Sequence, residues 1–245
     1  MALYQVTIAY DGTEFRGFQR QKGIRTVQNE IEKTLLKVGW NERSILSAGR
    51  TDTGVHAEGQ VIAFNLSWQH SVDDLKRALN DRMSPGIVVT SVQIAPENFH
   101  PRFDAILRKY RYQAYFSDTH DPLLDRYFWR VWPRPDVELM KKCAEWFTGT
   151  HDFRTYGKPP DENSTAIRTI ENACWELMEN RDQACFSISA KAFLYHMVRR
   201  IVYVLVRVGQ YRINASDLKD NIDGKMELLA GIAPANGLIL EQIIY

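Results

Sequence analysis

The 245-residue sequence has few cysteines, no long apolar run and no excess of charge of one sign, and each absence excludes a class of protein. The three cysteines form no C-x-x-C pair, and their odd number argues against a disulfide framework. The apolar stretch 201–206 is far shorter than the roughly 20 residues that span a bilayer. The first residues carry neither the basic nor the apolar region of a signal peptide. We therefore expect a cytoplasmic protein with no membrane partner.

The composition is that of an ordinary globular protein. With 44% hydrophobic and 25% charged residues, the chain is neither a disordered tail nor a collagen-like rod. The net charge of +1 does not by itself indicate a nucleic-acid-binding protein. However, residues 191–212 hold five basic residues and no acidic one, and the segment after residue 214 is net acidic. This sorting favours a basic surface on one face, against the alternative of chance clustering.

Periodicity predicts an α+β protein with two lobes, each a mostly antiparallel sheet with helices. Two prolines at positions 133 and 135 indicate the lobe boundary, so that the lobes span residues 1–132 and 133–245. A turn-rich loop is expected at 157–165, and a hairpin from 167–178 and 184–190. The other expected strands are 3–10, 44–48, 61–66, 87–94, 105–116, 127–132 and 238–245. The expected helices are 27–38, 72–83, 137–147 and 194–208, with a short helical stretch ending near Gly231.

The loop G-R-T-D-T-G-V-H-A at residues 49–57 is the densest cluster of potentially reactive side chains. It lies between two predicted strands, where a rigid scaffold can display functional groups. Arg50 two residues before Asp52 suggests an ion pair, which would keep the carboxylate charged even when partly desolvated. Such a carboxylate is a candidate nucleophile or base. The structural alternative is an aspartate that only caps a tight turn.

Two other chemistries compete for this loop. Residues 52–54 match the D-T-G of aspartic proteases, but that reaction needs two such carboxylates, and no second D-T-G or D-S-G is present. A metal site would recruit Asp52 and His56 with further ligands, and the other histidines show no H-x-H or H-E-x-x-H spacing. Each isolated histidine is therefore expected to be a surface or core residue, and neither chemistry is favoured.

Motifs along nearly the whole chain resemble those of the TruA-type tRNA pseudouridine synthases. The signature loop of that family is close to G-R-T-D-A-G-V-H-A, and this chain differs from it only at Thr53. Other matching motifs follow in order: F-x-G-F-x-x-Q at 15–21, T-V-Q at 26–28, F-H-x-R-F at 99–103, K-Y-R-Y at 109–112, H-D-F at 151–153, R-T-I at 168–170, F-L-x-x-M-V-R at 193–199 and G-L at 237–238.

The resemblance implies a fold, a substrate and roles for four residues. It implies two α+β lobes that meet at a catalytic cleft, and a homodimer that acts on the anticodon stem-loop of tRNA. Asp52 would be the catalytic nucleophile, flanked by Arg50 and Arg199, and Tyr110 would pack on the target base. Thr53 in place of the usual alanine leaves open which uridines are preferred.

The implied reaction detaches uracil at N1, turns it and rejoins it through C5, so it adds no atom and requires no redox cofactor and no metal. A carboxylate can attack the sugar C1′, add to C6 or take a proton from C2′, and the sequence does not choose among these routes. The uridine must first be turned out of the stack, and the flat ring of Tyr110 suits a stacking role. Tyr110 and Tyr112 share a predicted strand, and we expect one of the two to face outward.

Basic residues near these motifs are expected to hold the phosphate backbone and to add little base readout. They are Arg16, Arg20, Lys22 and Arg25 in the first loop, and Arg102, Arg108, Lys109 and Arg111 on or beside the Tyr110 strand. The alternative function is a catalytically silent RNA-binding protein on the same scaffold.

Overall fold

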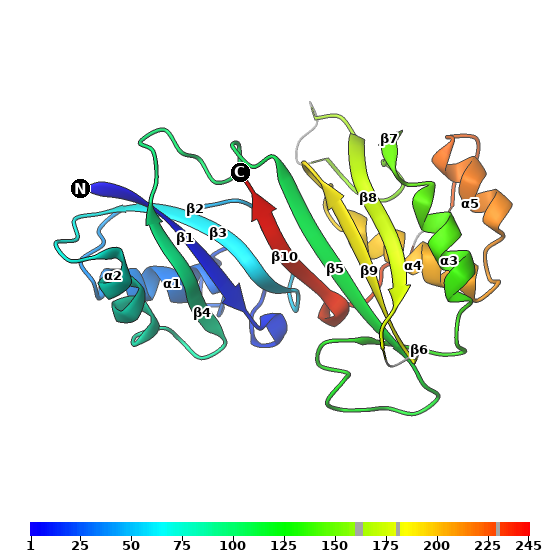
Figure 1. Ribbon diagram of the computed structural model, residues 1–245, viewed down its shortest axis with the longest axis horizontal. Coiled ribbons are helices and arrows are strands. Elements are labelled where there is room, and N and C mark those ends of the chain that lie inside the picture. The colour runs from blue at the N-terminus through cyan, green and yellow to red at the C-terminus, as the bar shows by residue number, and fades with distance from the viewer. Residues whose placement is uncertain (160–163, 180–181, 229–230) are drawn as a thin grey trace. The chain divides into compact units, whose positions relative to one another are not determined.

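A computed structural model describes residues 1–159, 164–179, 182–228 and 231–245, and it divides the chain into two compact units. The first unit comprises residues 1–106 and 239–245, and the second comprises residues 107–238. Each unit combines strands with helices, so the predicted α+β class and the mostly antiparallel pairing are confirmed (Figure 1). The boundary expected at residues 132–133 lies instead inside the second unit. The reason is that residues 107–131 contribute two strands to the second unit's own sheet.

The first unit contains a sheet whose strand order is β4-β1-β3-β10. β1 is antiparallel to both β3 and β4, whereas β10 is parallel to β3, and the short β2 also pairs with β3. β3 begins at His56, five residues earlier than predicted, so the loop before it ends at Val55. The bounds are β1 (Ala2–Tyr10), β2 (Leu46–Ser47), β3 (His56–Leu66), β4 (Ile87–Ile94) and β10 (Leu238–Ile244).

Two helices of the first unit begin at the polar caps that the sequence supplies. α1 (Val27–Leu36) begins after Thr26, whose side chain accepts a hydrogen bond from the Asn29 N–H, and α2 (Val72–Asn80) begins with a capping box. In α1 the apolar residues Val27, Ile31 and Leu35, which recur at helical spacing, are buried. A short 3₁₀ helix, η1 (Gly12–Glu14), directly follows β1. In Figure 1, α1 passes behind the strands of this sheet.

The second unit has the strand order β5-β9-β8-β7, and β6 pairs in parallel with β5. The predicted hairpin is confirmed as the antiparallel pair β8 and β9. The short polar strand β7 was not predicted, and residues 160–163 of the expected loop lie outside the described residues. The bounds are β5 (Leu107–Phe116), β6 (Trp129–Val131), β7 (Gly149–Asp152), β8 (Ile167–Leu177) and β9 (Gln183–Ala190).

The helices of the second unit are α3 (Val137–Glu145), α4 (Met197–Gly209), α5 (Ala215–Ile222) and the 3₁₀ helix η2 (Ala235–Gly237). α4 begins three residues later than predicted because His196 has a φ of 65°, which is left-handed and not helical. Its residues Met197, Ile201 and Leu205, which recur at helical spacing, are buried. α5 ends at Ile222, well before the end expected near Gly231.

The second unit has an aromatic cluster that includes one buried hydroxyl. The rings of Phe147 and Tyr156 meet edge to face at 5.3 Å between centroids, and the Tyr156 hydroxyl donates to Asn221 Oδ1 at 2.7 Å. Burial raises the pKa of Tyr156, so the hydroxyl stays a donor at neutral pH. All three cysteines are free thiols. Among the described ranges, no helix is both long and apolar enough to cross a membrane.

We expect the Tyr156 hydroxyl to contribute measurably to the free energy of unfolding. Tyr156→Phe removes the donor from the buried Asn221 side chain, and we expect a loss of about 1–2 kcal/mol in the free energy of unfolding. Tyr211→Phe is the matched control, because the exposed Tyr211 hydroxyl donates to Asp136 Oδ2 and its loss should cost less than about 0.5 kcal/mol. Urea unfolding of both variants measures the difference, and equal losses would contradict it.

Candidate functional site

Asp52 lies in a short loop of the first unit that has a buried residue on each side of it, Thr51 and Val55. The loop runs from residue 49 to residue 55; Asp52 is half-buried, whereas Thr51 and Val55 are buried. The Val55 N–H donates to the Asp52 carbonyl at 3.2 Å and closes the turn. Arg50 has an exposed side chain, and its ion pair with Asp52 stays a prediction. The loop therefore presents the carboxylate from a turn that is anchored on both sides.

The Tyr10 hydroxyl is one of these anchors. It lies 2.7 Å from Thr51 Oγ1, and both residues are buried. Tyr10 is the last residue of β1, and its ring packs near that of Phe18 at 6.4 Å between centroids. A buried hydroxyl without a hydrogen-bond partner is destabilising. The Tyr10–Thr51 pair therefore holds Thr51, the residue directly before Asp52, in place.

The segment after β1 supplies a second set of anchors through its backbone. The Phe18 N–H donates to the Thr51 carbonyl at 3.0 Å, and the Gly12 N–H donates to His56 Nδ1 at 3.0 Å. A Cβ at Gly12 would lie 2.1 Å from the Val55 carbonyl oxygen, so only glycine fits there. Gly17 has a φ of +85°, which favours glycine, and a Cβ there would lie 3.1 Å from the Thr51 carbonyl oxygen.

Helix α1 supports this segment from its other side. The Gln28 N–H donates to the Phe18 carbonyl at 2.9 Å, and the Val27 N–H donates to the Gly17 carbonyl at 3.3 Å. These N–H groups belong to the first turn of the helix, where no partner within the helix exists. The Asp52 loop, residues 12–18 and α1 are therefore joined by one continuous set of hydrogen bonds.

The basic residues of the first loop divide into two pairs. Arg20 binds the buried Glu32 at 2.6 Å, and Arg25 binds Glu14 at 2.6 Å, so these two guanidinium groups form ion pairs within the unit. Arg16 and Lys22 have exposed side chains. Of the four phosphate-binding candidates in this loop, Arg16 and Lys22 are the better placed to meet a ligand.

Tyr110 lies on β5 in the second unit. It pairs with Ile188, and Tyr112 pairs with Phe186, so the two tyrosines lie on the same face of the sheet. The expectation that one of them faces outward is wrong, because residues two apart on a strand share a face. Tyr112 is fully buried, whereas Tyr110 is half-buried, so the core role and the accessible role are divided along the strand rather than across it.

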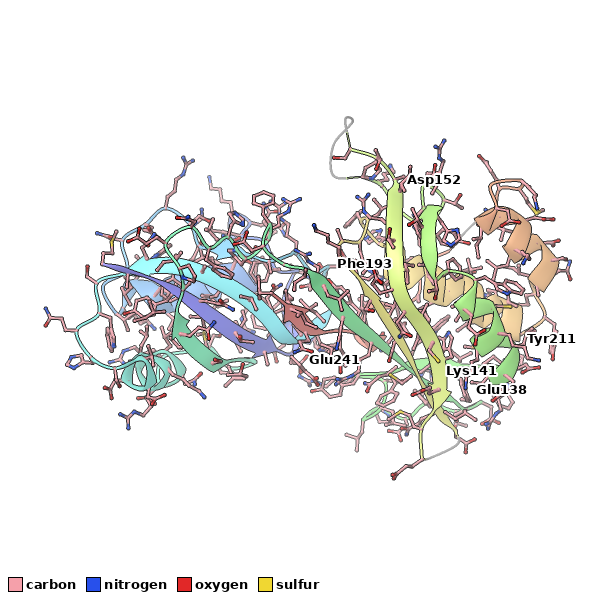
Figure 2. The ribbon with its side chains drawn as sticks, turned by 45° about the horizontal axis from the view of Figure 1, so that its top comes forward. Glu138, Lys141, Asp152, Phe193, Tyr211 and Glu241 are labelled. Carbon is pink, nitrogen blue, oxygen red and sulfur yellow. The ribbon has the colours of Figure 1, made fainter. Side chains whose placement is uncertain are left out.

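The two tyrosines also differ in their contacts. Phe193 meets Tyr110 edge to face at 5.3 Å, and Figure 2 shows Phe193 beyond the end of β9. The Tyr112 hydroxyl donates to the Pro234 carbonyl at 2.8 Å. Burial raises the pKa of Tyr112 well above its usual value, and the positive charge of Arg199 opposes the shift. Tyr112 is therefore a neutral core residue, and Tyr110 is the tyrosine with accessible surface.

Arg199 lies in the first turn of α4 and is half-buried. Its Nε donates to the Ala233 carbonyl at 2.8 Å, and its own carbonyl accepts from the Ala233 N–H at 3.1 Å. This pair of bonds fixes the residue to the segment that leads to β10. Asp52 and Arg50 thus belong to the first unit, and Tyr110 and Arg199 to the second. That all four act at one site stays a prediction.

Several residues that shape the loop were not predicted. No role in holding the loop was predicted for Tyr10, Gly12 or Gly17, although a tyrosine that ends an apolar strand often carries a buried hydroxyl in need of a partner. His56 was a candidate only as a metal ligand or as an isolated surface or core residue, whereas its buried ring accepts a hydrogen bond from the Gly12 N–H. In the described part of the chain, no group of three or more His, Cys, Asp or Glu side chains is arranged to hold a metal ion.

Comparison with known families and proteins gives a consistent result. A model of the family described as "tRNA pseudouridine synthase" matches residues 6–104 and 143–245, which include Arg50, Asp52 and Arg199 but not Tyr110. The chain is 36% identical over 247 residues to "tRNA pseudouridine synthase A" of Streptococcus pyogenes serotype M49 (strain NZ131), covering 100% of this chain and 99% of the relative. The protein of the same name from serotype M1 has the same identity and coverage.

Among solved structures, the "Crystal Structure of a Cbf5-Nop10-Gar1 Complex" is similar over 83% of this chain and 44% of that chain, with 11% identity and a TM-score of 0.37. A TM-score of this size supports no inference about this chain. The family match and the full-length identity to the streptococcal proteins are sufficient without it. The chain belongs to the tRNA pseudouridine synthase family.

Proposed function

We propose that this protein converts uridine to pseudouridine in tRNA and that Asp52 is its nucleophile. The observation that carries the proposal is the anchoring of the Asp52 loop, in which buried contacts on both sides hold a half-buried carboxylate in one place. A nucleophile that is already positioned avoids much of the entropic cost of reaching the reacting atom. Family membership supplies the substrate class.

The reaction conserves all atoms of the nucleotide. The N1–C1′ bond breaks, uracil turns within the site, and a C5–C1′ bond forms. The C5 proton is lost and N1 gains a proton. A fixed carboxylate suits each of three first steps, namely attack on C1′, addition to C6 and removal of the C2′ proton.

The second unit contributes two residues to the proposal. Tyr110 would stack on the extruded base, and its hydroxyl would bond a polar group near the reacting ring. The positive charges of Arg199 and Arg50 would stabilise the ionised carboxylate of Asp52 and bind nearby phosphates. We further propose that the substrate region is the anticodon stem-loop, and that the protein works as a cytoplasmic homodimer. Family membership is the support for these last points.

Asp52→Asn tests the proposed nucleophile. The amide keeps the size of the side chain but removes the negative charge, so we expect no tritium release from tRNA labelled at uridine C5, with tRNA binding largely intact. Tritium release measured beside a binding assay separates the two effects. Normal turnover by the variant would rule out Asp52. Absence of turnover by the unaltered protein, with binding retained, would favour the catalytically silent RNA-binding alternative.

Tyr110→Phe tests the hydroxyl apart from the ring. The ring can still stack, so the Kd for tRNA should stay the same while kcat falls roughly 100-fold, the lower range for loss of a positioned hydrogen-bond donor at a reacting centre. Single-turnover kinetics measure this change. An unchanged rate would limit Tyr110 to stacking.

Tyr10→Phe tests the buried anchor of the loop. Removing the hydroxyl leaves Thr51 Oγ1 without this partner, and we expect kcat to fall roughly ten-fold or more with little change in KM. Tyr4→Phe is the matched control, because Tyr4 is a buried tyrosine of the same strand whose ring stacks on Phe64. Its kcat should stay near that of the unaltered protein. Equal kcat values for the two variants would remove Tyr10 from loop positioning.

A further inference from the structure

Phe103 is a large apolar residue of the first unit whose side chain is exposed to solvent. The residue is 69% exposed, and it ends the F-H-x-R-F motif at residues 99–103. The only role expected of this motif so far is a phosphate contact from Arg102. Single exposed apolar residues are common in proteins, so the exposure of Phe103 does not by itself indicate a site.

The turn that carries Phe103 is closed by its own hydrogen bonds. The His100 carbonyl accepts from the Phe103 N–H at 3.2 Å and from the Asp104 N–H at 3.1 Å. Asp104 Oδ2 in turn accepts from the His100 N–H at 2.8 Å, and His100 Nδ1 accepts from the Arg102 N–H at 3.1 Å. The backbone under Phe103 is therefore fixed, which lowers the entropic cost of using its ring as a binding surface.

The C-terminal residue attaches this turn to the rest of the first unit. The Tyr245 hydroxyl donates to the Pro101 carbonyl at 2.9 Å, and the Tyr245 ring meets that of Phe99 edge to face at 5.0 Å. Phe99 is half-buried by this packing. The two phenylalanines of the motif thus differ, because Phe99 packs against the unit while Phe103 projects into solvent.

Two nitrogen-bearing side chains adjoin the Phe103 ring. The His100 ring lies 4.3 Å from it between centroids, and the Arg102 guanidinium carbon lies 5.7 Å from its centroid. We call His100, Arg102 and Phe103 the 100–103 platform. An exposed ring beside a guanidinium and an imidazole combines the two features by which proteins hold single-stranded nucleic acid, namely a stacking surface and positive charge.

We propose that the 100–103 platform binds an unpaired nucleobase of the RNA substrate by stacking on the Phe103 ring. This inference rests on the proposed function, since it takes tRNA as the ligand. Stacking on an aromatic ring tolerates any base, because every base has a flat face. The platform would therefore add affinity and hold the RNA in register without reading its sequence.

The surroundings of Phe103 favour a nucleotide over a protein partner. A protein interface needs a contiguous apolar patch, whereas most exposed residues of this segment are polar or charged. They are Glu97, Asn98, Arg102 and Asp104, and Ile106 is the other exposed large apolar residue. One flat ring among polar groups matches the size of a single base.

Phe103→Leu tests the platform in the Asp52→Asn protein, where binding can be measured without turnover. Leucine keeps an apolar side chain but has no flat face, so the Kd for an unmodified tRNA transcript should rise about ten-fold or more. The slope of log Kd against log salt concentration should stay the same, because no charge is removed. Phe103→Tyr keeps the ring and should retain the affinity.

Matched controls make the result specific. Tyr211→Leu removes another exposed aromatic ring, 72% exposed and beside α3 in Figure 2, and should leave the Kd within about two-fold. Unaltered affinity of Phe103→Leu would overturn the proposal, as would an equal loss in Phe103→Tyr. Failure of the proposed function appears separately, as absence of pseudouridine formation by the unaltered protein.

Ultraviolet crosslinking supplies an independent readout. Irradiation at 254 nm joins stacked aromatic rings to nucleobases, and trypsin releases Phe103 in the peptide 103–108, between Arg102 and Arg108. We expect a nucleotide adduct on this peptide in the complex with tRNA. An adduct found only on other peptides, or no adduct, contradicts the proposal.

Discussion

The structure of the first unit depends on the way in which β1 and the segment after it hold the Asp52 loop. The Tyr10–Thr51 hydroxyl pair and the Phe18–Thr51 backbone bond fix the residue before the carboxylate. Each such bond is worth only about 1 kcal/mol to folding. Their effect on the rate of a reaction is larger, because a displacement of about 1 Å at a reacting group can lower the rate roughly 100-fold.

Glycine makes this arrangement possible. The Val55 carbonyl occupies the space that a Cβ at position 12 would need. Because Gly12 has no Cβ, its backbone can approach the loop closely enough for the Gly12 N–H to bond His56. The same segment bonds to the first turn of α1. The rigidity of the loop thus comes from the N-terminal 30 residues of the chain, and the residues around Asp52 alone do not provide it.

The order of the chain divides the proposed catalytic residues between the two units. The chain leaves the first unit at residue 106 and returns to it at residue 239, where β10 pairs with β3. Arg199 takes part in this return, since it is bonded at two points to Ala233, in the segment that leads to β10. A change at Arg199 would therefore affect both the charge of the proposed site and the path of the chain.

The sequence predicted local patterns well and contacts between distant residues poorly. The stripe of α1, the buried face of α4 and the β8–β9 hairpin follow from periodicity, which neighbouring residues determine. The shared face of Tyr110 and Tyr112 follows from the same periodicity, so the expectation that one of them faces outward is wrong. The left-handed turn at His196 and the Tyr10–Thr51 bond depend on tertiary packing, so no spacing in the sequence indicates them. Asp52 was a candidate nucleophile or base from the residues of its loop, and the family resemblance implied its catalytic role, whereas its anchoring required the structure.

A map of the pseudouridines in cellular tRNA tests the central claim most directly. The comparison is between cells with the unaltered gene, cells that lack it and cells whose only copy encodes Asp52→Asn. The account predicts that the same uridines stay unmodified in the second and third strains. A full set of pseudouridines in the Asp52→Asn strain, at sites that are lost when the gene is absent, would contradict it.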